Sequence, residues 1–414
     1  MKIFIDGRRN YGSGIGRVTS NLIEGFLEFD VENDYIILIN KNDSCKKKSL
    51  NESGARVVEC EIPFFSKQDL YELPKIISAE KADVFFSPQF YISPFIECPS
   101  IKMVHDMWTL LHPKWIPTNK EFISKFGKES FAGIIELVNF FKKHYQKNLI
   151  FPRNKFVREK FNAPKIKLTY QYMIAMMSLT LYTANKITTP SFHSQEEIIQ
   201  LFPEVKNKVE VIPMFASPVF SSDGAKSKSN VLLHVSKWEP RKNLKRIIEA
   251  VNLVRESGVD CKLLIVGDKG YRKYGEDILN LISKSPYKDF VKLTGVIDDI
   301  NLSELYRSSY IFLFPTLYEG FGIPIVEAMA SGTPTITSNV TAMPEVSGNG
   351  AVLVSPKKVR DIARAIKKLL LDKKFYEEVR QRGFERIRNF DRKEIIFKYV
   401  SLIKEASIQK IQQI

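Results

Sequence analysis

The chain has 414 residues and a formal net charge of +15 at pH 7. Its length predicts two domains, because single hydrophobic cores stop growing well below this size. The composition, with 44% hydrophobic and 26% charged residues, is that of an ordinary folded, soluble protein. The four cysteines are scattered without metal-ligand spacing, which disfavours a disulfide framework and indicates free thiols in a reducing compartment.

The N-terminus, MKIFIDGRRN, lacks the length and the small-residue exit of a signal peptide. The most apolar later stretch, 170–184, is too short and too polar to span a bilayer. We therefore expect a cytoplasmic location, with peripheral binding to the inner face of the membrane as an alternative. The positive charge favours polyanionic partners such as anionic lipid, phosphorylated substrates or nucleic acid, unless it only reflects a basic proteome.

Short apolar runs followed by helical periodicity recur from the N-terminus onward. They predict parallel strands alternating with helices, joined by right-handed crossovers. The runs are KIFID (2–6), YIILI (35–39), DVFFS (83–87), a strand at 101–104, KITTPS (186–191), VEVIP (209–213), VLLHVS (231–236), KLLIVG (262–267), VKLTG (291–295), IFLFPT (311–316) and TPTITS (333–338).

The polar, turn-forming run SSDGAKSKSN at 221–230 is the best domain boundary. We predict an α/β protein with two Rossmann-like parallel-sheet domains, 1–220 and 221–390, facing a central cleft. The segment 391–414 has helical periodicity and is expected to pack back towards the N-terminal domain.

A glycine-rich loop follows the first strand. Gly12, Gly14 and Gly16 precede or begin a helix, whose N-terminus would direct N–H groups at an anion. The spacing differs from that of dinucleotide enzymes, and no acidic residue ends the second strand as NAD binding requires. A plain tight turn is the alternative for this loop.

The stretch from about 113 to 171, called the basic insertion below, interrupts the strand–helix pattern and contains thirteen Lys or Arg against four Glu. A stripe of apolar residues at helical spacing lies beside three lysines, which indicates either a membrane-surface helix or a helix packed on the domain core. The stripe is Phe131, Ile134, Ile135, Val138, Phe141 and Tyr145, and the lysines are Lys142, Lys143 and Lys147.

Three cations follow the strand that begins the C-terminal domain. Lys237, Arg241 and Lys242 lie at its carboxyl end, where they would neutralise a diphosphate. Taken alone, such a cluster is more often a solvated helix start.

The segment EGFGIPIVE, from Glu319 to Glu327, follows the strand 311–316. Its glycine turn leads into a helix whose first N–H groups would face phosphate or hydroxyl groups. Those N–H groups belong to Phe321, Gly322 and Ile323. A capping role alone does not account for two glutamates that bracket such a turn.

These motifs resemble the retaining glycosyltransferases of family four, which have the GT-B architecture of two Rossmann-like domains. The resemblance rests on the pair Glu319 and Glu327 with seven residues between them, on EPRKN, on PEV-x-G at 344–348, on GSGIGR and on His105-Asp106. It covers the chain except 113–171. One departure is Ser236-Lys237 where relatives carry Gly-Arg, which loses a bidentate fork towards phosphate.

The resemblance implies a role for each of these residues. Lys237 and Lys242 would contact the donor diphosphate, with Arg241 nearby, and Gly14 and Gly16 would approach it from the other domain. Glu327 would bind ribose, Glu319 the transferred sugar, and His105, followed by Asp106, would steady the reacting groups. Phe321, Gly322 and Ile323 would complete the donor site.

The implied reaction moves a hexose from a nucleoside-diphosphate sugar to a glycan hydroxyl with retention of configuration. Similarity to mannosyl- and rhamnosyltransferases of O-antigen type favours mannose, from GDP-mannose, and a lipid-linked or surface-polysaccharide acceptor. No cofactor or metal is expected, because no Asp-x-Asp motif appears and the cations with the helix dipole replace a metal ion. The sugar-nucleotide is a co-substrate.

Two alternatives stay open at this point. A glucosyltransferase similar to glycogen or sucrose synthase would use a soluble acceptor, which gives no reason for the basic insertion. A basic nucleic-acid-binding protein would account for the charge, but no reader motif is evident. A degenerate sugar-nucleotide sensor is disfavoured, because every charged position of the donor motif is filled.

Overall fold

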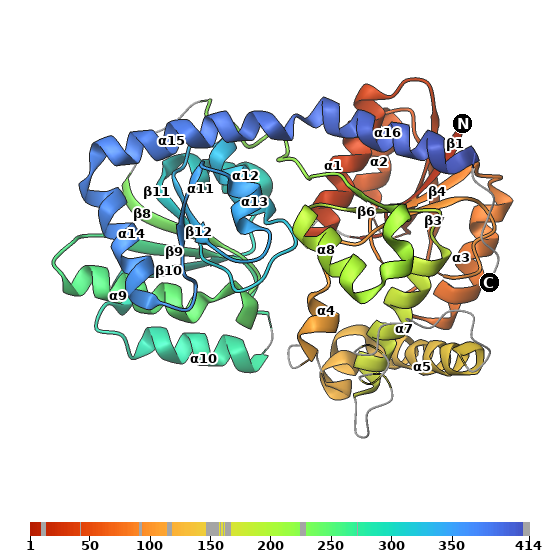
Figure 1. Cartoon of the computed structure of the whole chain (residues 1–414), viewed down its shortest axis with the longest axis horizontal. Helices are drawn as coiled ribbons and strands as arrows, with labels where there is room; N and C mark the ends of the chain where they lie inside the picture. The colour runs from red at the N-terminus through yellow and green to blue at the C-terminus, as the bar shows by residue number, and fades with distance from the viewer. Residues whose placement is uncertain are drawn as a thin grey trace. The chain divides into compact units, whose positions relative to one another are not determined.

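The computed structural model describes residues 1–9, 14–41, 43–90, 93–113, 118–145, 157, 159, 161, 167–223, 229–270 and 272–408. The chain divides into two compact units. Unit 1 comprises Met1–Pro213 together with Lys393–Ile414, and unit 2 comprises Met214–Arg392. The division falls a few residues before the polar run at 221–230. Both units are parallel sheets covered by helices (Figure 1).

Unit 1 contains a seven-stranded parallel sheet in the order β3-β2-β1-β4-β5-β6-β7. Its strands are β1 (Lys2–Asp6), β2 (Asp34–Asn40), β3 (Arg56–Cys60), β4 (Val84–Ser87), β5 (Ser100–Met103), β6 (Lys186–Thr189) and β7 (Val209–Val211). Its helices are α1 (Gly14–Phe29), α2 (Ser44–Glu52), α3 (Lys67–Ala79), α4 (Trp108–Leu111), α5 (Asn119–Tyr145), α7 (Leu168–Thr183), α8 (Phe192–Leu201), η2 (Pro203–Lys208) and α16 (Arg392–Ile408).

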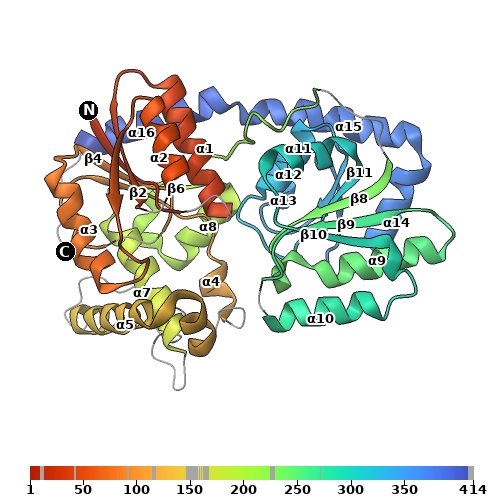
Figure 2. The same cartoon turned by 180° about the vertical axis from the view of Figure 1, so that it is seen from behind.

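Helix α5 and the start of α7 come from the basic insertion, and α5 packs against α7 at one end of the unit (Figure 2). Ile134, Val138 and Phe141 are buried in the core of unit 1, so the apolar stripe packs on the core there. Ile135 is 41% exposed. The side chain of Tyr145 and the whole of Lys147 lie outside the described residues, while Lys142 and Lys143 are exposed.

Helix α16 returns to unit 1 and packs on its sheet. The ring of Tyr399 lies 6.2 Å from that of Phe26 and 5.7 Å from that of Phe86, and Tyr399 is 1% exposed. An ion pair of 3.1 Å joins Glu405 to Lys186 on β6. Unit 1 is therefore completed by the last helix of the described chain.

Unit 2 contains a six-stranded parallel sheet in the order β10-β9-β8-β11-β12-β13. Its strands are β8 (Ser229–Val235), β9 (Lys262–Val266), β10 (Val291–Gly295), β11 (Ser309–Phe314), β12 (Thr335–Ser338) and β13 (Ala351–Val354). Its helices are η3 (Pro240–Lys242), α9 (Leu244–Glu256), α10 (Arg272–Ser283), η4 (Lys288–Phe290), α11 (Asp299–Ser308), α12 (Ile323–Ala330), α13 (Met343–Ser347), α14 (Val359–Leu371), α15 (Lys373–Ile387) and η5 (Arg388–Phe390).

The prediction of two parallel-sheet α/β units is confirmed. Helices α9 and α10 lie on one side of the second sheet and α11 and α12 on the other (Figures 1 and 2). Strands β8 and β11 are buried on both faces, which is why they appear as continuous apolar runs in the sequence. No helix in the described part of the chain combines the length and apolar content that crossing a bilayer requires.

Candidate active site

The order in which the strands follow one another in the sheet of unit 2 reverses between β8 and β11, and we call this position the switch point. These strands are neighbours in the sheet although two strands separate them in the sequence. Open parallel sheets bind ligands at this point, beyond the carboxyl ends of the strands. Residues 236–243 follow β8 and residues 315–322 follow β11. The donor-site residues predicted in this unit lie in these two loops or in α12.

Backbone contacts hold the first loop against the second. The carbonyl oxygen of Arg241 accepts a hydrogen bond from Leu317 N at 2.7 Å and another from Thr316 Oγ1 at 2.8 Å. Thr316 is completely buried. The segment that carries the predicted cations is therefore fixed to the loop that carries Glu319.

Asn243 fixes the end of the same segment. Its φ of 63° is left-handed, a conformation that asparagine tolerates better than most residues. Its Nδ2 donates to the carbonyls of Pro315 at 2.8 Å and Pro356 at 2.7 Å. These bonds tie the turn before α9 to the ends of two other segments.

Glu319 lies between two cations. One carboxylate oxygen is 2.5 Å from Lys242 Nζ and the other is 3.0 Å from Arg241 Nη1. Thr316 Oγ1 lies 3.2 Å from Glu319 Oε1, and Arg241 Nε contacts Glu239 at 2.9 Å. The side chains of the central three residues are only 10–16% exposed. Residues distant in the sequence thus form one cluster of charges beyond the carboxyl ends of β8 and β11.

Burial and charge set the protonation of this cluster. Burial alone would raise the pKa of Glu319, but the charges of Arg241 and Lys242 outweigh it and lower that pKa below its ordinary value. Burial, together with the charge of Arg241, lowers the pKa of Lys242. Glu319 is therefore a carboxylate at neutral pH.

The turn that follows is built by glycine and proline. Gly322 has a φ of 90°, and a Cβ at this position would lie 2.7 Å from Met343 Cε. Helix α12 begins at Ile323, with Pro324 in its first turn and no side-chain cap. The helix N-terminus therefore lies directly beside the cluster in the sequence, as the sequence pattern predicts.

Two of the predicted donor residues have buried side chains. Phe321 is 4% exposed and its ring meets that of Phe390 edge to face, so a ligand would contact its backbone. Glu327 is 2% exposed, and its Oε2 accepts a hydrogen bond of 3.0 Å from Tyr306 on α11. Tyr306 therefore fixes the orientation of Glu327 inside α12.

Lys237 is half-buried and has no ion pair in the described part of the chain. The preceding Ser236 lies 2.7 Å from Nε2 of His234, whose Nδ1 lies 2.8 Å from the carbonyl of Leu313. A carbonyl accepts only, so Nδ1 carries the proton and Nε2 accepts from Ser236. Burial lowers the pKa of His234 to about 4, which keeps its ring neutral.

His105 and Asp106 follow β5 in unit 1 and are half-buried. Nε2 of His105 lies 2.8 Å from the carbonyl of Pro88, so Nε2 carries the proton. Burial lowers the pKa of His105 to about 4, with a smaller contribution from the charge of Arg9. Oδ1 of Asp106 accepts a hydrogen bond of 3.2 Å from the backbone N–H of Trp108.

Gly14 is the first residue of α1, one or two residues before the predicted helix start, and Gly16 is buried in its first turn. A Cβ at Gly14 would meet nothing within 4 Å. Gly12 lies outside the described residues. The structure thus places Gly14 and Gly16 at a helix N-terminus of unit 1.

The described residues contain no cluster of three or more His, Cys, Asp or Glu arranged to hold a metal ion. Asp298, which with Asp299 follows β10, caps α11: its side chain accepts a hydrogen bond of 2.8 Å from Asn301 N. That no metal is required stays a prediction.

Sequence reasoning did not assign several residues that position this site. Asn243 had a signal in the EPRKN motif, whereas the others are ordinary residues in or after buried strands or in a helix. These residues are His234, Asn243, Tyr306 and Thr316.

Comparison with known proteins gives a family match for part of the chain and a likeness of fold. Residues 219–386 match the family described as glycosyl transferases group 1. The chain is similar to the O-antigen chain mannosyltransferase B of Escherichia coli, with 30% identity over 53% of this chain and 60% of that protein. It is also similar to the O-antigen chain mannosyltransferase RfbU of Salmonella typhimurium, with 29% identity over 48% of this chain and 54% of that protein. The match thus spans little more than half the length of these relatives.

Among solved structures, a glycosyltransferase from Rickettsia africae matches 99% of both chains with a TM-score of 0.68 and 16% identity. At that identity the likeness shows the fold alone, with two parallel-sheet α/β domains.

Proposed function

We propose that this chain, whose residues 219–386 form a group 1 glycosyltransferase domain, is a retaining hexosyltransferase. It transfers a hexose, with mannose favoured, from a nucleoside-diphosphate sugar to a hydroxyl of a lipid-linked or surface-polysaccharide glycan. GDP-mannose is the favoured donor. The chain acts in the cytoplasm, as a peripheral protein at the inner face of the membrane.

The observation that carries the proposal is the contact of Glu319 with both Lys242 and Arg241 at the switch point of unit 2. Cleavage of a glycosyl–phosphate bond leaves negative charge on the diphosphate, and cations held in place stabilise that charge. Glu319 contacts both cations, and its carboxylate would accept a hydrogen bond from a sugar hydroxyl at the same place. Glu327, oriented by Tyr306, would bind the ribose.

In unit 1, His105 is neutral near pH 7 and its proton is on Nε2. Its Nδ1 therefore has a lone pair that would accept a hydrogen bond from a hydroxyl of the sugar or the acceptor. We assign it a positioning role in the reaction. No carboxylate is required as a covalent nucleophile. In the proposed reaction the acceptor hydroxyl attacks from the face that the diphosphate leaves, and the leaving phosphate assists this displacement.

The choice of mannose and of a glycan acceptor is supported by the names of the relatives, which are O-antigen mannosyltransferases. Binding to an anionic membrane surface is supported by the net charge of +15 and by the exposed lysines at the end of α5. Nucleic acid is not part of the proposal.

A donor screen tests it. The purified chain is incubated with GDP-mannose, UDP-glucose, UDP-GlcNAc and dTDP-rhamnose, and donor hydrolysis is followed for each. We expect GDP-mannose to turn over fastest and Lys242→Met to lower that turnover at least about 100-fold, the usual scale for a lost electrostatic contact to developing charge. Absence of binding and turnover with all four donors contradicts the proposal, and preference for UDP-glucose contradicts its mannosyl part.

A further inference from the structure

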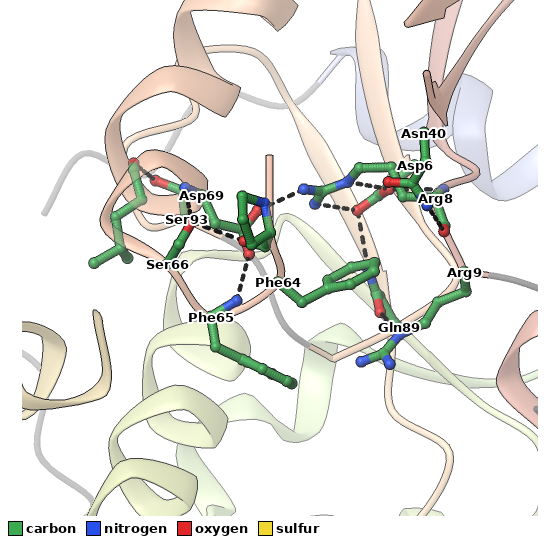
Figure 3. A network of polar contacts seen from close by, with 12 residues as sticks. Asp6, Arg8, Arg9, Asn40, Phe64, Phe65, Ser66, Asp69, Gln89 and Ser93 are labelled. Carbon is green, nitrogen blue, oxygen red and sulfur yellow. Dashed lines mark hydrogen bonds and ion pairs between the residues drawn. The ribbon is translucent and has the colours of Figure 1, made fainter. Parts of the chain in front are cut away.

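The switch point of unit 1 lies between β1 and β4, which are adjacent in the sheet. A buried network of charges lies there (Figure 3). Arg8 contacts Asp6 through Nε at 2.9 Å and through Nη2 at 2.8 Å, and its Nη1 contacts Asp69 at 2.8 Å. All three side chains have an exposure of 0%. Arg8 therefore has its guanidinium engaged on both edges by protein carboxylates.

Asp69 connects this network to α3 and to the loop before it. Its backbone N–H donates to Ser66 at 3.2 Å, and its Oδ2 accepts from the backbone N–H of Phe65 at 3.1 Å. Helix α5 supports the same loop, because a Cβ at Gly133 would lie 2.0 Å from the carbonyl oxygen of Phe65. The basic insertion thus packs against the segment that holds the network.

Arg9 is held differently. Its Nε donates to Gln89 Oε1 at 2.8 Å, and Gln89 Nε2 in turn donates to Asp6 at 2.9 Å. The guanidinium carbon lies 4.2 Å from the centre of the Phe64 ring. Within the described part of the chain, the contacts of Arg9 include no carboxylate and no acceptor for its terminal nitrogens.

Arg9 is half-buried, and burial lowers its pKa from the ordinary value. A guanidinium that is partly removed from water loses hydration, and an anion restores that loss best. A planar fork oriented by an amide and by an aromatic face suits bidentate binding of phosphate. Arg8 pairs with both aspartates, and neither aspartate contacts Arg9 directly. The terminal nitrogens of Arg9 are therefore available to a ligand.

Arg9 also lies near the residue that we assign to substrate positioning. Its charge contributes to the low pKa of His105, and His105 contacts the carbonyl of Pro88, next to Gln89. A group bound to Arg9 would therefore be close to a neutral imidazole that accepts hydrogen bonds.

We propose that Arg9 is an anion-binding residue that takes a phosphate group of one of the two substrates on the surface of unit 1. The ligand rests on the proposed function, since a sugar nucleotide and a lipid-linked acceptor both carry phosphate. The binding capacity of Arg9 follows from its contacts and does not depend on turnover.

The test compares Arg9→Gln with the wild-type chain of 414 residues by calorimetric titration of two probes. GDP represents the leaving group of the donor, and geranyl diphosphate is a water-soluble representative of a phosphorylated lipid acceptor. We expect Arg9→Gln to weaken binding of at least one probe by about 10- to 150-fold, the scale of a lost hydrogen bond to a charged group. The weakened probe identifies the substrate that carries the phosphate.

Two further variants serve as controls. Arg56→Gln makes the same chemical change at a side chain that is 68% exposed on the edge strand β3, and we expect both affinities to be unchanged. Arg9→Lys keeps the charge without the fork, so its loss should be smaller than that of Arg9→Gln, and it provides the measurement if Arg9→Gln does not fold.

Unchanged affinity of folded Arg9→Gln for both probes, within about twofold, overturns the inference; the same result for Arg9→Lys does so if Arg9→Gln does not fold. This outcome is separate from failure of the proposed function, which appears as absence of donor turnover in the wild-type chain. Binding of either probe that depends on Arg9 supports the inference even when no tested donor turns over.

Discussion

In each unit a pair of basic residues follows the first strand of the sheet, but the two pairs have different partners. After β8, Arg241 and Lys242 share the carboxylate of Glu319. After β1, Arg8 contacts two aspartates, and Arg9 contacts the neutral amide of Gln89. Both pairs lie at the switch point of their sheet, where the order of the strands reverses.

The degree of burial separates the two arrangements further. Arg8 and its two aspartates are excluded from water, whereas the side chains of Arg241, Lys242 and Glu319 are 10–16% exposed. A fully buried ion network supports structure, while a cluster at the loop edge can exchange its partners with a ligand. The position of a basic residue after a strand therefore does not set its role. The partner does.

Removal of the buried cation should have the largest effect on stability. Arg8→Met leaves Asp6 and Asp69 buried with no cation, and loss of one partner of a buried ion pair costs about 3–5 kcal/mol. We expect unfolding in urea to show this loss or unit 1 not to fold. The triple variant Arg8→Met, Asp6→Asn and Asp69→Asn should recover most of it, because no charge stays buried. A mild effect of Arg8→Met alone would show that the network is not needed for the fold.

Removal of the shared carboxylate should affect catalysis more than stability. In Glu319→Gln the cations stay, so we expect turnover of the preferred donor to fall about 100-fold or more, a loss on the scale of one transition-state contact. GDP should bind more tightly, because Arg241 and Lys242 no longer share their charge with Glu319. Single-turnover kinetics and calorimetry measure the two effects. Weaker GDP binding would mean that Glu319 holds the cations in place and does not compete with the ligand.

The neutral histidine beneath the cluster should make unit 2 sensitive to acid. The pKa of His234 in the folded chain is about 4, below the ordinary value of 6.5, because burial disfavours the charged ring. The unfolded chain therefore takes up a proton first as pH falls. The stability from the neutral ring is complete above about pH 6.5 and is lost as pH falls towards 4.

His234→Gln removes this titration. Between pH 7 and pH 5 the melting temperature of the variant should fall less than that of the wild-type chain, although it starts lower at pH 7. Glu319→Gln is the matched comparison. Because the pKa of Glu319 is lowered, the stability that its carboxylate contributes is lost only at a pH below the ordinary pKa of a glutamate. Parallel curves for His234→Gln and wild type would contradict the assignment.

Much of the fold was predictable because the central strands of a parallel sheet are continuous apolar runs. The prediction missed the edge strands β3 and β13. In β3, Arg56 and Glu59 are exposed, so the run is interrupted by charge. Strand β13 is apolar throughout, as AVLV, but it has only four residues directly after Gly350, so the run is too short to stand out. The other two edge strands, β7 and β10, were predicted, so charge within the run or its short length hid β3 and β13.

The site was predictable where a motif carries the chemistry locally, as with Lys242 and Glu319. The contacts that hold the motif were not, because they join residues far apart in the sequence. Tyr306 reaches Glu327, and Arg8 reaches Asp69, 61 residues away. Such pairs depend on which loops the sheet order brings together, and a single sequence does not show that order.

The smallest effect expected comes from the hydroxyl that joins the two loops of unit 2. Thr316→Val keeps the shape of a buried side chain but removes the donor to the carbonyl of Arg241, which then has only Leu317 N. We expect a loss of about 1 kcal/mol in urea unfolding, the scale of one buried hydrogen bond. The donor KM should rise several-fold, because the segment that carries Arg241 is less firmly held.

Thr337→Val on β12 is the control, since it removes an equally buried hydrogen bond of 3.0 Å to the carbonyl of Phe314, within the sheet. It should lower stability similarly and leave KM unchanged. Equal KM values for the two variants would mean that Thr316 supports the fold and does not position the cations.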